Sequence, residues 1–163
     1  LTDQLPPSKR LEFLAERARR LELAQITFSE VISELETRDA ATFSEIVFLF
    51  YRNAYFYRAD CAYELGRFEQ AIELYDLATK RWEHHPASMV ALIQIVNAYC
   101  ELGKTQEARV ANGRARWQLK RIPEHAFEDP DLPLTRQHWQ DWLRWTDELD
   151  LFGAKAGTVA EEG

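Results

Sequence analysis

The sequence contains few of the residues that mark turns, disulfides or metal cages. Its 163 residues include only six Gly, six Pro and two Cys. So few Gly and Pro leave long uninterrupted segments, which favours an all-helical chain. Cys61 and Cys100 are too few for a disulfide framework. Both fall in apolar helical patterns, where a Cys acts as a small hydrophobic residue.

Long apolar runs and a basic excess are also missing. No stretch approaches the roughly 18 apolar residues of a membrane-spanning helix, so we predict no span. The 20 Lys and Arg are outnumbered by 27 Asp and Glu, and the net charge is −7. An acidic surface repels phosphate backbones, so we predict no nucleic-acid partner. One basic cluster is interpreted as a solvated helix face: Arg109, Arg114, Arg116, Lys120 and Arg121.

Hydrophobic residues make up 46% of the chain, which is enough for the core of one domain. Apolar residues spaced by three, four or seven predict a long amphipathic helix over 9–37, with Ser8 as its N-cap. The narrow stripe is typical of a coiled-coil seam and indicates a long antiparallel hairpin. A break near Thr27 is also compatible with the pattern. The seam consists of Leu11, Leu14, Ala18, Leu21, Phe28, Ile32 and Leu35, interrupted by Gln25.

The segment 43–66 is the most aromatic of the chain, with eight Phe and Tyr. It follows short polar residues over 37–42, which predict a turn. Gly66 predicts the end of a helix over 43–65, because Gly adopts the left-handed conformation at little cost. We expect 43–51 to form core against the first helix. Tyr55, Ala59 and Ala62 are expected to face the core.

The chain repeats itself after this segment. Gly66 returns as Gly103, at an offset of 37 residues, and Glu64-Leu65 and Pro86 return at the same offset. A fixed period between 20 and 50 residues is typical of stacked repeats. Each unit is predicted to be a helix, a Gly turn, a second helix and a Pro break. Ala pairs at the same offset let the two helices of one unit approach closely.

The segment 66–86 resembles the second helix of a tetratricopeptide repeat. The residues that match that family in order are Gly66, Phe68, Ala71, Ile72, Tyr75, Ala78 and Pro86. The second unit keeps Gly103, Ala108, Ala115 and Pro123 but has Thr105 and Asn112 where aromatic residues are usual. The long period is similar to that of bacterial envelope-type members. The resemblance implies a short α-solenoid and a protein of the bacterial cytoplasm or envelope.

The C-terminal part is predicted to cap the repeats. Thr135 is expected to cap a helix over 136–149, whose main face is formed by Trp139, Trp142, Leu143, Thr146 and Leu149. Stacked repeats need their ends covered. We therefore predict one domain of about six helices over 1–152. It comprises a hairpin over 8–65, two repeat units over 52–123, a capping helix over 135–149 and, beyond them, a flexible tail over 153–163.

Two clusters of polar residues are interpreted as structural rather than chemical sites. The adjacent His84 and His85 would point about 100° apart on a helix, and zinc sites on helices prefer spacings of three or four. They are interpreted, with Glu83, as a polar turn before Pro86. Asp60 and Glu64 share one helix face, but no nucleophile with a nearby His accompanies them. We predict no catalytic residue, no metal and no cofactor, and hence no enzyme.

The resemblance implies a different kind of site. In tetratricopeptide repeats the first helices of successive units line a concave groove that holds peptides. The corresponding positions here are Asn53, Phe56, Asp60, Tyr63, Val90, Ile93 and Asn97. This groove is either open or filled by the first or the last helix.

The function expected from these patterns is a non-catalytic module that binds a peptide or a protein surface through the concave face. The alternative is a structural or self-assembly module that associates through the long N-terminal helix or the Trp-rich C-terminal helix. The expected partner is thus a protein or peptide, and a homo-oligomer is compatible with the sequence.

Overall fold

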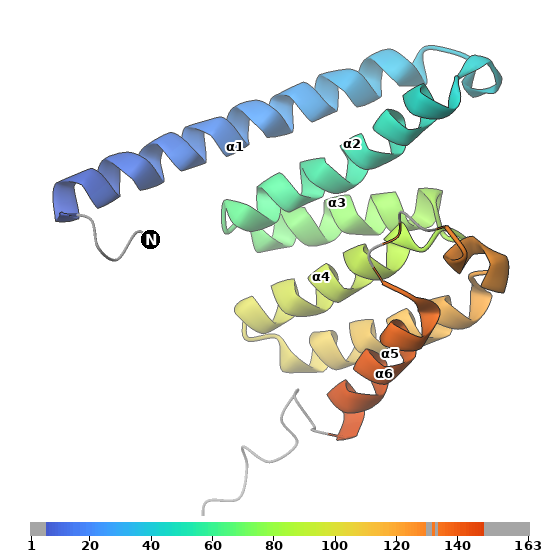
Figure 1. Ribbon diagram of the computed structural model, residues 1–163. Helices are drawn as coiled ribbons and strands as arrows, with labels where there is room; N and C mark the ends of the chain where they lie inside the picture. Colours follow the sequence, from blue (N-terminus) through green and yellow to red (C-terminus); the bar gives the residue numbers. More distant parts are fainter. Residues whose placement is uncertain (1–5, 130–131, 133, 149–163) are drawn as a thin grey trace, which may run out of the picture. The chain divides into compact units, whose positions relative to one another are not determined.

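The structure is a computed structural model that describes residues 6–129, 132 and 134–148. It confirms the predicted fold class, because the described residues form six α-helices and no strand, and the helices pack as hairpins. The helices are α1 (Pro7–Glu36), α2 (Glu45–Glu64), α3 (Phe68–Arg81), α4 (Ala87–Glu101), α5 (Thr105–Arg121) and α6 (Arg136–Glu148) (Figure 1).

The described residues fall into two compact units, within Leu1–Ala78 and Thr79–Gly163. The boundary lies near the end of α3. The single domain over 1–152 stays a prediction, and the predicted flexible tail over 153–163 lies outside the described residues.

The first unit is built on a hairpin of α1 and α2. α1 is continuous, so the chain does not break near Thr27. Ile32, a residue of the predicted seam, is buried in the hairpin, with 3% of its surface exposed. Tyr55, Ala59 and Ala62 of α2 are buried as expected. A hydrogen bond from the Tyr55 hydroxyl to Glu36 joins the two helices.

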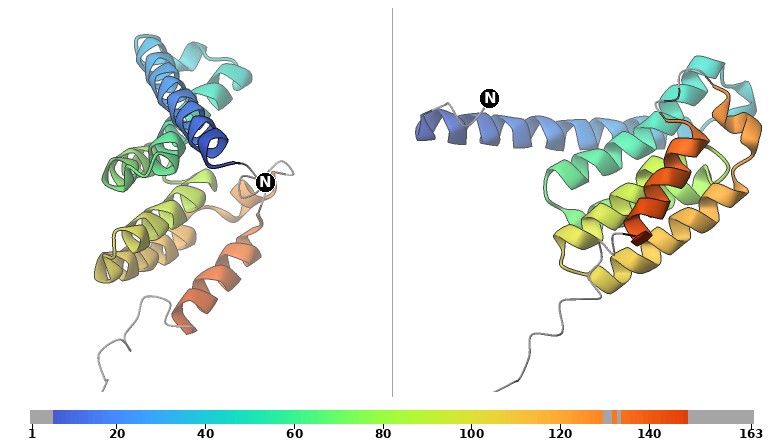
Figure 2. Two further views of the ribbon diagram at one scale, coloured as in Figure 1. Left: turned by 90° about the vertical axis from the view of Figure 1, so that its left-hand side faces the viewer. Right: turned by 60° about the horizontal axis from the view of Figure 1, so that its bottom comes forward.

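Two details of α1 were predicted wrongly. Ser8 is not the N-cap: the helix begins at Pro7, after Pro6, and no side chain caps it. Pro suits the first helical position because its missing N–H would have no partner there. The predicted seam is also covered only in part, because Leu11 and Leu14 are exposed, Leu11 by 69%. α1 extends beyond the end of α2 (Figures 1 and 2), so no helix of this unit covers its first turns.

α2 begins after Ser44, whose hydroxyl accepts a hydrogen bond from the Val47 N–H. The prediction that 43–51 forms core is wrong in large part. Tyr51 is buried and stacks edge-on against Phe43, with ring centroids 5.7 Å apart. Four of its neighbours are exposed: Ile46, Phe48, Leu49 and Phe50. α2 is apolar around most of its circumference here, and one partner helix cannot cover every side.

A turn with a left-handed Gly66, at φ 72°, connects α2 to α3. The two helices are joined by an edge-to-face contact between Tyr63 and Phe68, with ring centroids 5.3 Å apart. The Tyr75 hydroxyl also donates a hydrogen bond to Asp60 Oδ1 at 2.5 Å.

The second unit repeats this design. α4 and α5 form a hairpin around Gly103, at φ 68°, which matches Gly66 at the predicted offset. The predicted close approach through Ala residues is present. Ala91 and Ala98 of α4 are buried, as are Ala108, Ala111 and Ala115 of α5.

α6 packs on α5, with Trp139 and Leu143 buried. The Thr135 hydroxyl accepts a hydrogen bond from the His138 N–H, as expected of an N-cap. The Nδ2 of the buried Asn112 of α5 donates a hydrogen bond to the Thr146 hydroxyl at 3.1 Å. This bond helps to dock α6 on α5. Leu149, the last predicted member of the α6 face, lies outside the described residues.

Candidate functional site

The first unit contains an apolar groove of about 540 Å³ between α1 and α2. Its walls are Phe28, Val31, Glu34 and Leu35 of α1 and Val47, Phe50, Asn53, Ala54 and Tyr57 of α2. The rings of Phe28 and Tyr57 meet across it, with centroids 5.7 Å apart. Glu34 is the only residue lining this groove that carries a carboxylate. That carboxylate already pairs with Arg38 at 2.5 Å, so the groove suits an apolar ligand surface.

The groove arises because each helix carries a second apolar stripe beside the one that packs in the hairpin. Its α1 members, Phe28, Val31 and Leu35, recur every three or four residues, and so do its α2 members. That spacing keeps them on one side of a helix. Phe50 is 62% exposed, and Tyr57 is also exposed. Exposed Ile46 and Leu49 of α2 continue the same side toward the N-terminal end of that helix.

A second, more polar pocket of about 490 Å³ lies on another side of α1. Its lining includes Gln25, Ser29, Glu30 and Arg58. These residues belong to the polar surface of the unit and do not form a cluster of catalytic groups.

The four predicted groove positions on α2 have different surroundings. Phe56 is buried, and Tyr63 is half-buried against Phe68. Asp60 is half-buried, and its carboxylate accepts a hydrogen bond from the Tyr75 hydroxyl. Burial raises the pKa of Asp60, the Tyr75 hydrogen bond lowers it, and the nearby Glu64 raises it. Asn53 is the one position among these four that lines the apolar groove.

The three predicted positions on α4 lie in the second unit. Val90 is exposed, whereas Ile93 and Asn97 are half-buried. Their spacing places them on one side of α4. Asn97 donates a hydrogen bond from Nδ2 to Gln94 Oε1 at 2.8 Å. The stripe is therefore accessible in part.

The histidine cluster has structural partners. His84 lies 3.2 Å from Glu83, and the Nδ1 of His85 accepts a hydrogen bond from the Ala87 N–H at the start of α4. Within the described part of the chain, no group of three His, Cys, Asp or Glu residues is placed to hold a metal ion. The same residues include no helix that combines the length and hydrophobicity of a membrane span.

The predicted basic cluster on α5 also has neighbours. Arg121 lies 3.5 Å from Glu83 and stacks over the ring of Trp117, with 4.3 Å from its guanidinium carbon to the ring centroid. Arg114 donates a hydrogen bond to Thr79 at 3.4 Å. Local partners thus engage part of this cluster.

The apolar groove was missed in the sequence, although a signal for it exists. Phe28 and Leu35 were assigned to the hairpin seam and Phe50 to the core. Val31 between the first two, and Val47, Phe50 and Tyr57 on the aromatic helix, continue the three-and-four spacing of a second stripe. Helices with two apolar stripes need two partners, and this unit supplies only one along the groove.

No family model, no curated protein and no solved structure matches the chain.

Proposed function

We propose that the protein is a non-catalytic interaction module that binds a peptide or a protein surface through helix faces of its helical hairpins. The observation that carries this proposal is the apolar groove between α1 and α2. Contiguous exposed apolar surface is rare on soluble proteins unless it meets a partner. Phe50 and Tyr57 stand exposed in the groove, and Ile46 and Leu49 extend it.

The shape and charge of the groove support one kind of partner. A cleft between two helices accepts an amphipathic helix whose apolar residues recur every three or four positions. Glu34 is the carboxylate that lines the groove, where it pairs with Arg38 at 2.5 Å, and the chain as a whole has a net charge of −7. We therefore propose an amphipathic helix with basic flanking residues as the ligand.

The concave face expected from the tetratricopeptide resemblance remains part of the proposal as a secondary surface. The stripe of Val90, Ile93 and Asn97 on α4 supports it, because these side chains are at least partly accessible. Support is weaker on α2, where Phe56 is buried and Asp60 is engaged by Tyr75. The groove between α1 and α2 is therefore the principal candidate.

The test is a fluorescence anisotropy titration with a labelled synthetic helix that carries Leu at helical spacing and Lys on its flanks. We expect saturable binding to the wild-type chain and at least about tenfold weaker binding to Phe50→Glu, which puts a charge into the groove. Phe48→Glu is the matched control. Phe48 is also exposed but lies two residues away, on another side of α2.

Absence of binding to a wild-type chain that sediments as a monomer would refute the groove as a helix-binding site. Equal losses in Phe50→Glu and Phe48→Glu would also count against it. A loss in Asn97→Ala, with Phe50→Glu unaffected, would move the site to the stripe on α4.

A further inference from the structure

The N-terminal part of α1 has a free-standing apolar surface of its own. Arg17 forms an ion pair with Glu64, the last residue of α2, so α1 passes the end of its partner at that point. The ten residues Pro7–Glu16, called the overhang below, extend farther by about 15 Å at 1.5 Å per residue. Figures 1 and 2 show α1 projecting beyond α2.

Three large apolar side chains of the overhang are exposed: Leu11, Phe13 and Leu14. An isolated helix of this length is marginal in water. Burial of these side chains on a partner would stabilise the overhang.

The overhang and the groove lie on the same side of α1. Phe13 and Val31, a wall of the groove, are separated by about five turns of 3.6 residues, so their side chains project in the same direction. Two copies of α1 laid side by side in opposite directions therefore place each overhang over the groove of the other copy. A two-fold dimer requires such self-complementary surfaces on one chain.

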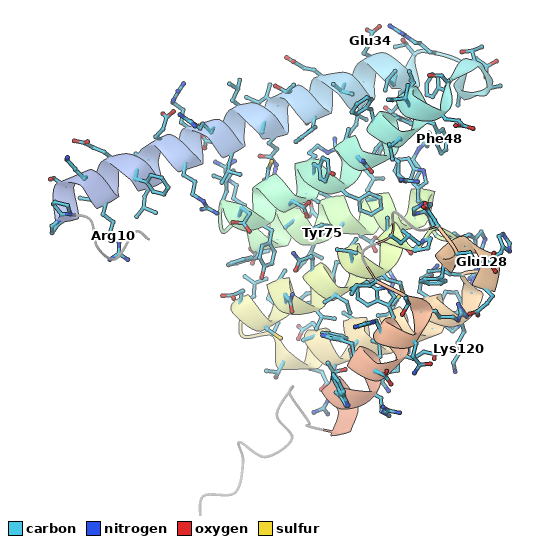
Figure 3. All side chains as sticks on the ribbon, viewed as in Figure 1. Arg10, Glu34, Phe48, Tyr75, Lys120 and Glu128 are labelled. Carbon is cyan, nitrogen blue, oxygen red and sulfur yellow. The ribbon has the colours of Figure 1, made fainter. Side chains whose placement is uncertain are left out.

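The charges of α1 favour the opposite directions. Residues 7–20 contain five basic and two acidic residues, whereas residues 21–36 contain four acidic residues and no basic one. Figure 3 shows Arg10 near one end of α1 and Glu34 near the other. Antiparallel copies bring the basic half of each helix beside the acidic half of the other. Parallel copies would bring like charges together, which is unfavourable.

We infer that the groove between α1 and α2 binds the overhang of a second copy of this chain, so that the protein forms an antiparallel two-fold dimer. This inference rests on the proposed function, since it names the occupant of the same groove. Phe13 and Leu14 supply the apolar contacts, and the basic end of the overhang at Lys9 and Arg10 lies beside the acidic end of α1 in the other copy, which carries Glu30 and Glu34. Every contact occurs twice, which doubles the surface that one overhang buries.

The dimer is tested by sedimentation equilibrium of the full chain at micromolar concentration. We expect a mass twice that of one chain. Phe13→Glu and Phe50→Glu should each weaken dimerisation at least about tenfold, because each places a charge in an apolar contact. Phe48→Glu should leave the mass unchanged. Circular dichroism checks that every variant keeps its helices.

A charge exchange tests the direction of the helices. The variant Lys9→Glu plus Arg10→Glu and the variant Glu30→Lys plus Glu34→Lys should each sediment as monomers, because like charges then meet in the homodimer. An equimolar mixture of the two should regain the mass of a dimer, since each overhang finds a groove of opposite charge.

A monomeric wild-type chain would overturn the inference, and so would a mixture that stays monomeric. If the wild-type chain is a monomer yet binds the synthetic helix with sensitivity to Phe50→Glu, the dimer fails while the proposed function stands. If a dimer forms that is insensitive to Phe50→Glu, and no synthetic helix binds, then the groove is not a binding site and both proposals fail.

Discussion

At the residue scale, Asp60 and Tyr75 form a structural pair. Tyr75 is fully buried, and its hydroxyl requires an acceptor. Asp60 Oδ1 provides that acceptor at 2.5 Å. Burial, more than any other cause, raises the pKa of the Asp60 carboxyl. An ionised Asp60 is thus held in surroundings that favour its neutral form, so this residue is better explained by the core than by ligand binding.

We predict that Asp60→Asn raises the free energy of unfolding at pH 7. The amide oxygen still accepts the Tyr75 hydrogen bond, and the unfavourable buried charge is removed. The folded pKa of Asp60 lies above the unfolded value of about 3.9. Its contribution to stability is therefore fully present below that value and is lost as the pH rises through the folded pKa. Urea unfolding at several pH values should show the variant's advantage growing with pH.

Asp60→Ala is the control for the hydrogen bond. It leaves the buried Tyr75 hydroxyl without its acceptor and should lower the free energy of unfolding by about 1–3 kcal/mol. A less stable Asp60→Asn at pH 7, or an advantage that grows as the pH falls, would contradict this account.

At the element scale, the two hairpin turns share one construction. In the first, the Gly66 N–H bonds to the Tyr63 carbonyl at 2.8 Å and the Arg67 N–H to the Ala62 carbonyl at 2.9 Å. The second has the same pair of bonds around Gly103. This pattern closes the end of a helix and requires a left-handed residue at the Gly position.

We predict that Gly66→Ala and Gly103→Ala each lower the free energy of unfolding by about 1 kcal/mol, because an L-residue is strained at these φ angles of 72° and 68°. Gly113→Ala is the matched control. Gly113 lies inside α5, and an added Cβ there meets no atom within 4 Å. It should stabilise the helix by roughly 0.5–1 kcal/mol. Urea unfolding of the three variants measures whether each change raises or lowers the free energy of unfolding. Destabilisation by Gly113→Ala would contradict this account of the glycines.

The same elements show what the sequence could predict. Gly66 and Gly103 predicted both hairpin turns correctly, because a left-handed backbone position favours Gly and can therefore be recognised in the sequence. The buried Ala pairs and the Thr135 cap were also recognisable from single residues. The boundary at Pro7 was misplaced by two residues, since both Pro and Ser are favourable near a helix start.

The exposed apolar surface was not predictable in the same way. The periodicity of Leu11 and Leu14 continues that of the buried Ile32, and only the different lengths of α1 and α2 leave the first two uncovered. Likewise, an aromatic-rich α2 does not indicate which of its sides has a partner. The candidate groove depends on where neighbouring helices end, and this is a property of the packing rather than of a local pattern.

At the scale of the whole molecule, the proposed dimer combines apolar contacts with exposed ion pairs. The net charge of −7 would repel two copies in any arrangement that ignored where the charges lie. The uneven charge along α1 offsets this locally. Arg19 and Arg20 are already engaged by Glu16, whose pKa the two guanidinium groups lower to about 2. Lys9 and Arg10, at the tip of the overhang, meet the acidic half of another copy in the antiparallel arrangement.

We predict that dimerisation weakens roughly tenfold when the ionic strength rises from about 0.1 to about 1 M, because the Debye length falls from about 10 to about 3 Å. Two symmetric sets of exposed ion pairs, each contributing about 0.2–1 kcal/mol per pair, account for that magnitude. The measurement is the dimer dissociation constant from sedimentation equilibrium at both salt concentrations.

The variant Glu30→Gln plus Glu34→Gln separates this charge effect from the apolar contacts. It removes the acidic partners but keeps Phe28, Val31, Phe50 and Tyr57, so its dimer should be weaker at low salt and nearly independent of salt. The dissociation constants of the variant and the wild type should then converge at about 1 M, where the Debye length is about 3 Å. A wild-type dimer that tightens with salt would mean that apolar burial alone holds the copies together, and the antiparallel direction would then lose its electrostatic basis.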